Sequence, residues 1–538
     1  MPRRNPGMMG SIAPNTNTES RLFDSTAIRA NMTLANGQLA WMSPQESAWF
    51  SFTASSHMDD DDEVDMWLSK ATTTVRDALA RSKFYNVIHE FYLDRGGFGT
   101  ACMFVEEDGS GTGKLNFKLW SVGTFTIDEN HSGDIDTVFR EFELTARQAT
   151  QKFGEKVSKE IKDAMKKPET CDRKFKFVHA IYPREDADRD MGKMGGQNMP
   201  IASVYFEDTA KYLNKVGGYE EMPAFVSRYL EWGTGLGHLY GWCPAFAALP
   251  DARQANFLQE MMDALAEKKA FPPILAPAEL EGEIEIEAGG ITYHSKDMIG
   301  GKDRMPQEWN LAGDYNIGKD RIDVRQQAIN DAFHVDLFQM FAELDKQMTA
   351  REVAARSQEK LIQFSPTFAR LTTEVFEPLL NSAFSIMLRA GLLGTPPQSL
   401  IQDQGDGTGI VEVPVIEYNS RIAMALRALP AIATLDTFEN VANVAQLVPD
   451  VLDLFDWDGA IKSVAISSGF PPEFIRSKSQ VENIREQRAE QLAQAQQQEQ
   501  QIAAAGALKD VGSIPGDSAV GEMVEGEFAN ARDQAQGI

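Results

Sequence analysis

Two glycine-rich segments are the first places where this sequence could do chemistry, because backbone amides in such loops can hold phosphate groups. Residues 108–115 read Asp-Gly-Ser-Gly-Thr-Gly-Lys-Leu. Asp108 takes the place of the first glycine of a phosphate loop, and Leu115 stands where a hydroxyl residue would bind magnesium, so we predict a β-turn. In Gly-Thr-Gly-Leu-Gly-His, at 233–238, the third glycine comes too early for a dinucleotide fingerprint. Neither segment predicts a nucleotide site.

The metal-binding residue types are also scattered rather than clustered. The seven histidines form no H-x-x-x-H pair, and the acidic residues at 59–62 and at 186, 188 and 190 have no adjacent base or phosphate cradle. Cys102, Cys171 and Cys243 are widely spaced and form no C-x-x-C pair, so we predict three buried apolar thiols. We therefore predict no catalytic residue, no metal and no cofactor.

Length and charge limit the remaining classes of protein. With 538 residues, 43% hydrophobic and 24% charged, the chain can bury a large core in about two to four structural units. No apolar run approaches the roughly 20 residues of a membrane span, and the start lacks a signal peptide, so we expect no membrane partner and synthesis in a cytoplasm. A formal charge of -27 argues against tight binding of nucleic acid. It fits ordinary surface charge or the wall of a tunnel through which DNA slides.

The first half of the chain predicts an α+β unit. The apolar spacing of residues 64–92 is that of an amphipathic helix, which Gly96, Gly97 and Gly99 should end. Residues 100–106 and 114–120 should form a β-hairpin. Further segments follow in order: strands at 124–128 and 137–144, a short helix at 145–165, and strands at 175–182 and 201–206.

The second half is mainly helical. A helix at 251–270 follows Pro250 and is stopped by Phe271-Pro272-Pro273, and a β excursion at 274–316 separates it from a helix beginning near Ile317. Thr349 with Glu352 suggests a capping box for a long helix that reaches 393, and Pro366 and Pro378 should kink it.

Four short motifs, in this order along the chain, carry a family resemblance. They are Tyr240-Gly241-Trp242-Cys243-Pro244, the run 348–361 (MTAREVAARSQEKL), Glu377-Pro378-Leu379-Leu380 and Arg389-Ala390-Gly391. Over about residues 21–480, the sequence resembles the portal proteins, or head-to-tail connectors, of short-tailed double-stranded DNA phages.

The resemblance implies the portal fold, which combines an α/β wing, a helical stem, a small α/β clip, a long kinked wing helix and a helical crown. It also implies a ring, typically of twelve subunits, at one capsid vertex of the virion. The implied segments are a flexible arm at 1–20, a wing at 21–246, stem helices at 247–270 and 317–334, a clip at 271–316, a tunnel loop at 335–348, the long wing helix and its return at 349–410, a crown at 411–505 and a flexible tail at 506–538.

Three groups of candidate residues follow from that assignment. Lys268, Lys269, Lys319, Arg321 and Arg325 would guide DNA along the channel. Phe338, Met340 and Phe341 would narrow the tunnel, although burial in the subunit explains them equally well. In the clip, the docking candidates are Glu283, Glu285, Glu287, Trp309 and Tyr315, for which core packing is again an alternative.

The implied partners are further copies of the chain, double-stranded DNA in transit, the terminase large subunit, a tail adaptor protein, the major capsid protein, and scaffolding or internal core proteins. Two other classes of protein stay open. A nuclease or packaging ATPase would need a phosphate loop or metal cluster that these residues do not display. A non-viral scaffold that self-associates through helices would account for the helices but not for the order of the segments.

Overall fold

The computed structural model divides into two compact units, residues 1–452 and residues 453–538. It describes residues 22–54, 62–107, 113–186, 189, 195–231, 239–270, 274–275, 307–308, 315–344, 364–403, 409–424 and 454–467, with isolated positions at 434, 437, 438, 441, 481 and 484–491. The predicted arm, the predicted tail, the capping box at Thr349 and the motif at 348–361 lie outside these residues.

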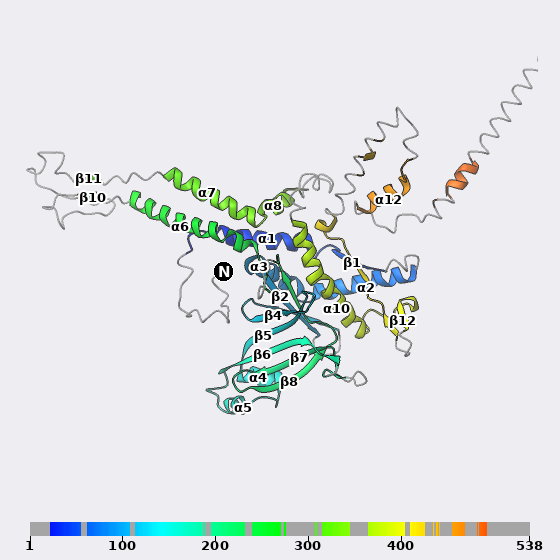
Figure 1. The fold of residues 1–538 in the computed structure, drawn as a ribbon, viewed down its shortest axis with the longest axis horizontal. Helices are drawn as coiled ribbons and strands as arrows, with labels where there is room; N and C mark the ends of the chain where they lie inside the picture. Colours follow the sequence, from blue (N-terminus) through cyan, green and yellow to red (C-terminus); the bar gives the residue numbers. More distant parts are fainter. Residues whose placement is uncertain are drawn as a thin grey trace, which may run out of the picture. The chain divides into compact units, whose positions relative to one another are not determined.

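A five-stranded antiparallel sheet forms one part of the first unit (Figure 1). Its strands, in spatial order, are β4 (Phe125–Glu129), β5 (Ile135–Thr145), β6 (Lys174–Pro183), β7 (Ile201–Glu207) and β8 (Tyr212–Tyr219). Helices α4 (Ala146–Phe153) and α5 (Lys159–Met165) cover one face, where Phe153, Ile161 and Phe177 share a core.

A second, three-stranded antiparallel sheet has the order β3–β2–β9, with β2 at Thr100–Glu107, β3 at Leu115–Trp120 and β9 at Ala224–Arg228. Cys102 pairs with Trp120 and Glu107 with Leu115, which confirms the predicted hairpin. Phe104 stacks on Trp120 with ring centroids 4.7 Å apart, in a cluster shared with β4, β5 and β6. The two sheets therefore bury a common set of side chains.

There are three N-terminal helices: α1 (Thr26–Met42), α2 (Asp62–Arg81) and α3 (Phe84–Phe98). The helix α3 packs on the smaller sheet, and α1 and α2 pack on α3. The continuous helix predicted over 64–92 is wrong, because the chain turns at Ser82, whose hydroxyl accepts from the amide of Phe84. Gly96 does not break α3. A Cβ at Gly96 would lie 2.2 Å from the side-chain oxygen of Asn31, so the missing side chain lets α1 and α3 approach closely. The helix ends at Gly99, which has φ +82°.

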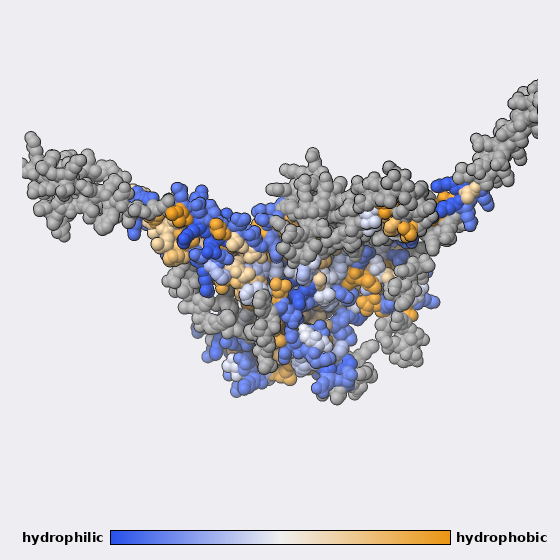
Figure 2. All heavy atoms as spheres, turned by 45° about the horizontal axis from the view of Figure 1, so that its top comes forward, coloured by the Kyte–Doolittle hydropathy of each residue, from blue (hydrophilic) through white to orange (hydrophobic). Residues whose placement is uncertain are grey.

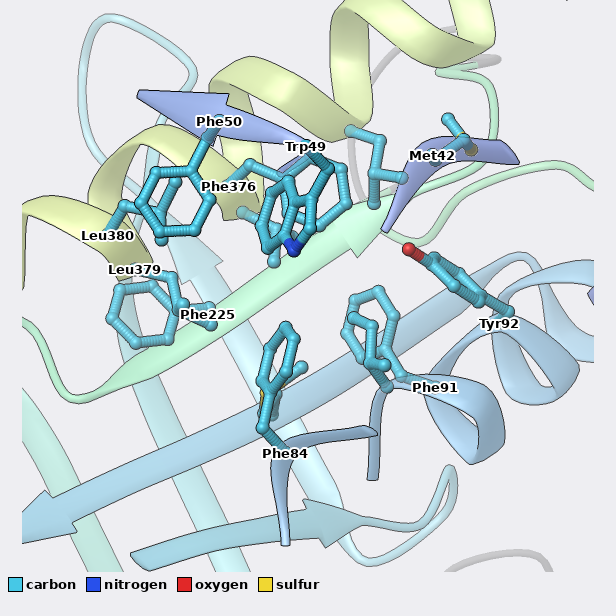
Figure 3. Close-up of a cluster of buried hydrophobic side chains, with 14 of the residues drawn as sticks. Met42, Trp49, Phe50, Phe84, Phe91, Tyr92, Phe225, Phe376, Leu379 and Leu380 are labelled. Carbon is cyan, nitrogen blue, oxygen red and sulfur yellow. The ribbon is translucent and has the colours of Figure 1, made fainter. Parts of the chain in front are cut away.

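The largest core joins the two ends of the first unit (Figure 3). Trp49, fully buried, lies 4.7 Å from Phe50 and 5.0 Å from Phe376, measured between ring centroids. The strand β1 (Phe50–Thr53) pairs with β14 (Val415–Tyr418), so residues more than 360 positions apart are neighbours. Ile416 and Tyr418, on β14, pack against this core. They lie within residues 411–505, for which a crown stays a prediction.

Two long helices extend from this unit, α6 (Pro244–Ala270) and α7 (Tyr315–Ala332), and α8 (Val335–Leu344) follows α7. The helix α6 begins three residues earlier than the predicted 247 and contains Pro250. Proline leaves the carbonyl four residues earlier without its helical donor. That residue is Phe246, which is 41% exposed, so water can reach the first turns of the helix.

A π-helical turn, η6 (Thr372–Phe376), lies directly before α10 (Glu377–Arg389), and Pro378 stands in the first turn of α10. Pro366 lies in the helical residues 364–371 that precede η6. The remaining elements are short: β10 (Ile274–Leu275), β11 (Gln307–Glu308), η7 (Gln398–Leu400), β12 (Ile401–Asp403), β13 (Gly409–Val411) and, in the second unit, α12 (Trp457–Ser467).

The single helix predicted at 145–165 is wrong because local caps divide it. Thr145 and Gln148 form a capping box at the start of α4, Gly154 ends that helix with φ +62°, and the Ser158 hydroxyl caps α5. The prediction of three buried cysteines holds for Cys102 and Cys243 and is wrong for Cys171, which is partly exposed.

Candidate functional site

The helices α6 and α7 pack side by side and are the elements that carry the candidate DNA-channel residues (Figure 1). A Cβ at Gly318 would lie 2.3 Å from the sulfur of Met262, so the glycine permits close approach of the two helices. The β10–β11 pair, in which Ile274 lies opposite Glu308, closes the base of the predicted β excursion between them.

Four of the five candidate cations are exposed. Lys268 and Lys269 lie in the last turn of α6, and Lys319 and Arg321 lie near the start of α7. Arg325 differs, because its guanidinium donates to the carboxylate of Asp251 at 2.8 Å. That ion pair joins α7 to α6, so Arg325 stabilises the contact between the two helices.

The same two helices expose large apolar side chains. The exposed fractions are 58% for Phe257, 54% for Met261, 57% for Ile317 and 62% for Val324. Figure 2 shows apolar patches among polar ones over this part of the surface. Such a concentration on protruding helices is typical of surfaces that are covered by a protein partner.

The segment before α1 is tied to both helices. The side-chain oxygen of Asn256, on α6, accepts from the backbone amides of Phe23 (2.8 Å) and Asp24 (3.2 Å). The carboxylate of Asp24 accepts from the amide of Thr26 at 2.7 Å and from Gln326, on α7, at 2.8 Å. Asp24 therefore links the first residue of α1 to α7, and Asn256 links the preceding backbone to α6.

The predicted tunnel loop is helical over its first ten residues, as α8. Phe338 is 4% exposed and lies edge-on to Phe364, with ring centroids 5.7 Å apart. It also fills the space next to Gly37, where a Cβ would lie 2.1 Å from its ring. Within the single subunit, Phe338 is therefore a core residue, which was the alternative to a tunnel constriction. The side chains of Met340 and Phe341, also in α8, lie outside the described residues.

The candidate clip residues are largely beyond what the structure describes. Glu283, Glu285, Glu287 and Trp309 lie outside the described residues. Tyr315 is the first residue of α7 rather than part of the excursion, and its side chain also lies outside the described set. Their docking role stays a prediction.

The glycine-rich segment at 108–115 runs into a strand. Lys114 leads directly into β3 instead of opening a helix. Residues 108–112 lie outside the described residues, so the β-turn stays a prediction. Residues 233–238 lie outside the described part. No group of three or more His, Cys, Asp or Glu side chains that could hold a metal ion occurs among the described residues. Nor does any helix there have the length and apolar character needed to cross a membrane.

His179 is a core histidine. It is 2% exposed, stacks on Tyr205 with ring centroids 3.8 Å apart, and shares a 2.9 Å hydrogen bond with the hydroxyl of Ser203. Burial, followed by the nearby cations Lys152 and Arg140, lowers the pKa of His179 to about 2. The imidazole is therefore neutral at physiological pH.

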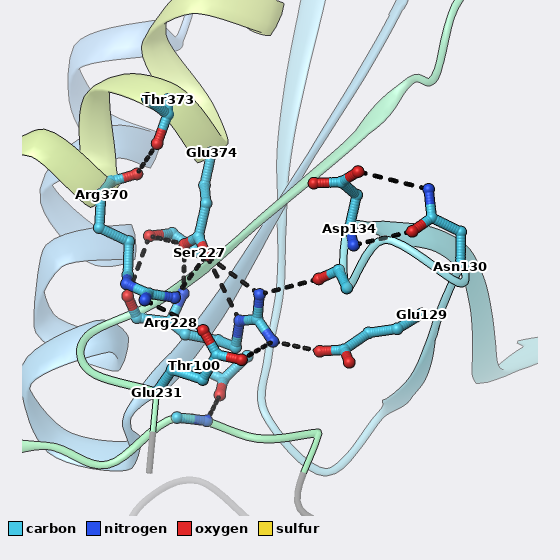
Figure 4. Close-up of polar contacts among 12 residues, drawn as sticks. Thr100, Glu129, Asn130, Asp134, Ser227, Arg228, Glu231, Arg370, Thr373 and Glu374 are labelled. Carbon is cyan, nitrogen blue, oxygen red and sulfur yellow. Dashed lines mark hydrogen bonds and ion pairs between the residues drawn. The ribbon is translucent and has the colours of Figure 1, made fainter. Parts of the chain in front are cut away.

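A polar cluster joins β9 to η6 (Figure 4). The Glu374 carboxylate accepts from the backbone amide of Arg228 at 2.8 Å, from the Ser227 hydroxyl at 3.0 Å and from Arg370 at 3.1 Å. The Arg228 guanidinium, 6% exposed, pairs with both Glu374 and Glu129. We call Glu129, Ser227, Arg228, Arg370 and Glu374 the arginine hub.

A fully buried cation lies beside this hub. Arg95, on α3, donates to the Ser227 hydroxyl and to the carbonyl of Thr367, and its guanidinium lies 5.1 Å from the ring centre of Tyr229. Burial lowers the pKa of Arg95 to about 10, and the charge of Glu374 opposes that shift. The negative charge of Glu374 thus offsets the positive charges of Arg95, Arg228 and Arg370. Together these residues hold η6 against the smaller sheet.

Comparison with known proteins decides the family. Residues 1–475 match the profile of the family described as "Bacteriophage head to tail connecting protein". The chain belongs to this family. It is 33% identical over 484 residues to the probable portal protein of Bordetella phage BPP-1, a match that covers 89% of this chain and 84% of that protein. It is 30% identical over 505 residues to the portal protein of Salmonella phage epsilon15, covering 92% and 87%.

A solved chain of the virion of the native gene transfer agent particle is also similar, with a TM-score of 0.35 and 11% identity, covering 87% of this chain and 97% of that one. The sequence relatives confirm the predicted family, and the mixed helical and sheet structure is consistent with the predicted α+β class.

Sequence reasoning about this family member missed the arginine hub. Its residues are separated by up to 245 positions, from Glu129 to Glu374, and no spacing rule connects them. The one available signal was the combination of a charged residue, Glu374, with a predicted proline kink at Pro378.

Proposed function

We propose that this chain is a portal subunit, and that its copies form a ring-shaped channel at one capsid vertex through which double-stranded DNA enters and leaves. In this proposal α6 and α7 form the stem, residues 271–314 the clip, and the two sheets with α1 to α5 the wing. The chain acts as a structural channel and not as an enzyme.

The observation that carries the proposal is the apolar surface of the α6–α7 pair. Phe257, Met261, Ile317 and Val324 are each more than half exposed in the single subunit. Neighbouring copies related by rotation would cover these side chains, since a repeated contact between two different faces generates a ring when the rotation closes. The exposed cations Lys268, Lys269, Lys319 and Arg321 would then guide phosphates weakly along the channel.

The partners follow from this role. Terminase and then the tail adaptor would dock at the clip, the major capsid protein and scaffolding or internal core proteins would contact the wing and crown, and the ring would reside in the virion. The names of the family and of its two phage relatives support a position between head and tail.

The size and shape of the purified protein test the proposal. Twelve copies of 59.6 kDa would give about 715 kDa by light scattering, and negative-stain images should show rings with a central hole. Phe257→Asp with Ile317→Asp should yield monomers, because charged groups would be buried between subunits. Leu213→Asp, at a site 56% exposed on β8, is the matched control and should leave rings intact.

Two outcomes would contradict the proposal. Wild-type protein that stays monomeric at high concentration would exclude a ring-forming channel. Rings that persist in the Phe257 and Ile317 double variant would show that the exposed face of α6 and α7 is not the contact between subunits.

A further inference from the structure

One short region of this acidic chain has the opposite charge. Residues 146–176 contain ten Lys or Arg and five Asp or Glu, a net charge of +5, whereas the rest of the chain contains 42 and 74, a net charge of -32. The region comprises α4, α5 and the start of β6, and every residue in it is described. Its excess of cations is therefore a feature of one place in the fold.

All ten Lys and Arg residues of this region are exposed, and Lys152 in addition places its ammonium 4.3 Å from the ring centre of Tyr205. We call them the lysine cap: Arg147, Lys152, Lys156, Lys159, Lys162, Lys166, Lys167, Arg173, Lys174 and Lys176. The reason for the exposure is the packing of the two helices. Ile161 and Ala164 of α5 are buried against the sheet, so the opposite face of the helix carries Lys159, Lys162 and Lys166 at spacings of three and four residues.

Few of these charges are neutralised by neighbours. Three ion pairs involve cap residues: Lys166 with Asp163 at 2.8 Å, Lys162 with Glu155 at 3.4 Å and Lys174 with Glu143 at 3.4 Å, with all six side chains at least 44% exposed. Ion pairs in water at such exposure contribute little to stability and are readily exchanged for another anion. Within the cap, Arg147, Lys156 and Lys159 form no ion pair with any described residue.

The cap is distant from the proposed channel helices. Figure 1 shows α4 and α5 on the five-stranded sheet, at the opposite side of the first unit from α6 and α7. At physiological salt, charges farther apart than about 8 Å are largely screened, so the acidic remainder of the chain does not cancel the local potential of the cap. A polyanion near the cap would therefore meet a cationic surface.

The composition of the cap distinguishes between two kinds of polyanion, an acidic protein surface and a nucleic acid. Contacts between proteins are depleted in lysine and enriched in aromatic residues, and they usually contain a buried apolar anchor. The cap has eight lysines and two arginines, and Met165, 37% exposed, is its only exposed large apolar residue. Exposed lysines without an apolar centre match contact with a phosphate backbone, which needs charge and no base reading.

We propose that the lysine cap binds the phosphate backbone of double-stranded DNA without sequence preference, at a site on the wing outside the channel. In the proposed ring every copy would present one cap, so several weak contacts would act together on one duplex. The site goes beyond the channel function, since it would hold DNA that is not in transit.

The test uses the full chain and a fluorescent duplex of about 40 base pairs, with binding followed by anisotropy between roughly 50 and 200 mM salt. The cap variant is Lys159→Gln, Lys162→Gln and Lys166→Gln. The control, Lys70→Gln, Arg81→Gln and Lys83→Gln, removes three exposed cations from α2 and the turn after it. Circular dichroism and sizing confirm that each variant folds and assembles like the wild type.

The cap variant should bind about tenfold more weakly at 50 mM salt, and the slope of log K against log salt should fall by about 2 to 3, because each lost phosphate contact removes about 0.9 from that slope. The control should change affinity less than twofold, and two duplexes of different sequence should behave alike.

Equal losses in cap and control variants, or wild-type protein that does not bind the duplex, would overturn the proposal. Unchanged DNA binding combined with reduced incorporation of the cap variant into capsids would overturn it too, and would assign the cap to an acidic protein surface. Sizing separates this result from failure of the channel proposal: rings without cap-dependent DNA binding refute only the lysine cap, whereas the absence of rings refutes the channel.

Discussion

Replacing Glu374 by Gln isolates the charge at the centre of the arginine hub. The substitution keeps the size of the side chain and one acceptor oxygen but removes the negative charge that faces Arg228 and Arg370. Arg228 is 6% exposed, and Glu129 remains as its other close carboxylate partner. Arg95, fully buried, would lose a nearby opposing charge.

The expected cost follows from the burial of these groups. Breaking a buried ion pair by removing one partner costs about 3–5 kcal/mol. The amide retains hydrogen bonds to the Arg228 amide and the Ser227 hydroxyl, and Arg370 is partly exposed, so we expect a loss of about 2–3 kcal/mol in the free energy of unfolding. Glu374→Gln should also loosen the π-helical turn more than the sheet.

Urea unfolding followed by tryptophan fluorescence measures this loss as a lower midpoint at unchanged slope. Glu377→Gln, at an exposed position in the next turn, is the matched control and should change stability by less than about 0.5 kcal/mol. If both variants lost the same small amount of unfolding free energy, the charge of Glu374 would not stabilise the hub and the reasoning would be wrong.

Two further predictions concern single residues. Because the pKa of His179 is about 2 in the folded chain and about 6.5 in the unfolded chain, only the unfolded state gains this proton as pH falls below 6.5, and stability should drop by about 1.4 kcal/mol per pH unit from this group. His179→Gln should flatten urea-derived stability between pH 6.5 and 4.5 relative to wild type, and an unaltered slope would contradict the assignment. Gly99→Ala should destabilise the chain more than Gly154→Ala in thermal unfolding, since both glycines have positive φ but only at Gly99 would a Cβ meet a backbone oxygen, that of Gly241, at 2.0 Å. Equal decreases in melting temperature for the two glycine variants would refute the steric argument.

Much of the local structure could be predicted because its causes lie within a few residues. The pairing of β2 and β3 follows from two runs of strand-forming residues on either side of a glycine-rich sequence, and α6 ends where Pro272 and Pro273 follow it. The capping box at Thr145 could have been found in the same way, since Gln148 lies three residues later.

The family could also be predicted, although no catalytic chemistry marks it. The order of short motifs over a long stretch carried that resemblance, and the two phage portal proteins confirmed it. The candidate site was harder. Arg325, a candidate channel cation, pairs with Asp251 of α6. Phe338, for which a tunnel constriction and core packing were both open, packs against Phe364. Their roles in a channel stay predictions.

The sequence by itself determined the β2–β3 hairpin, the end of α6, the acidic character of the chain and the cationic stretch at 146–176, because these depend on neighbouring residues. Tertiary structure alone decided that β1 pairs with β14, that Gly96 continues a helix, and that Glu374 meets Arg228. In each case the partners are tens to hundreds of residues apart. Burial and close packing in the folded chain select such partners, and local periodicity contains no record of them.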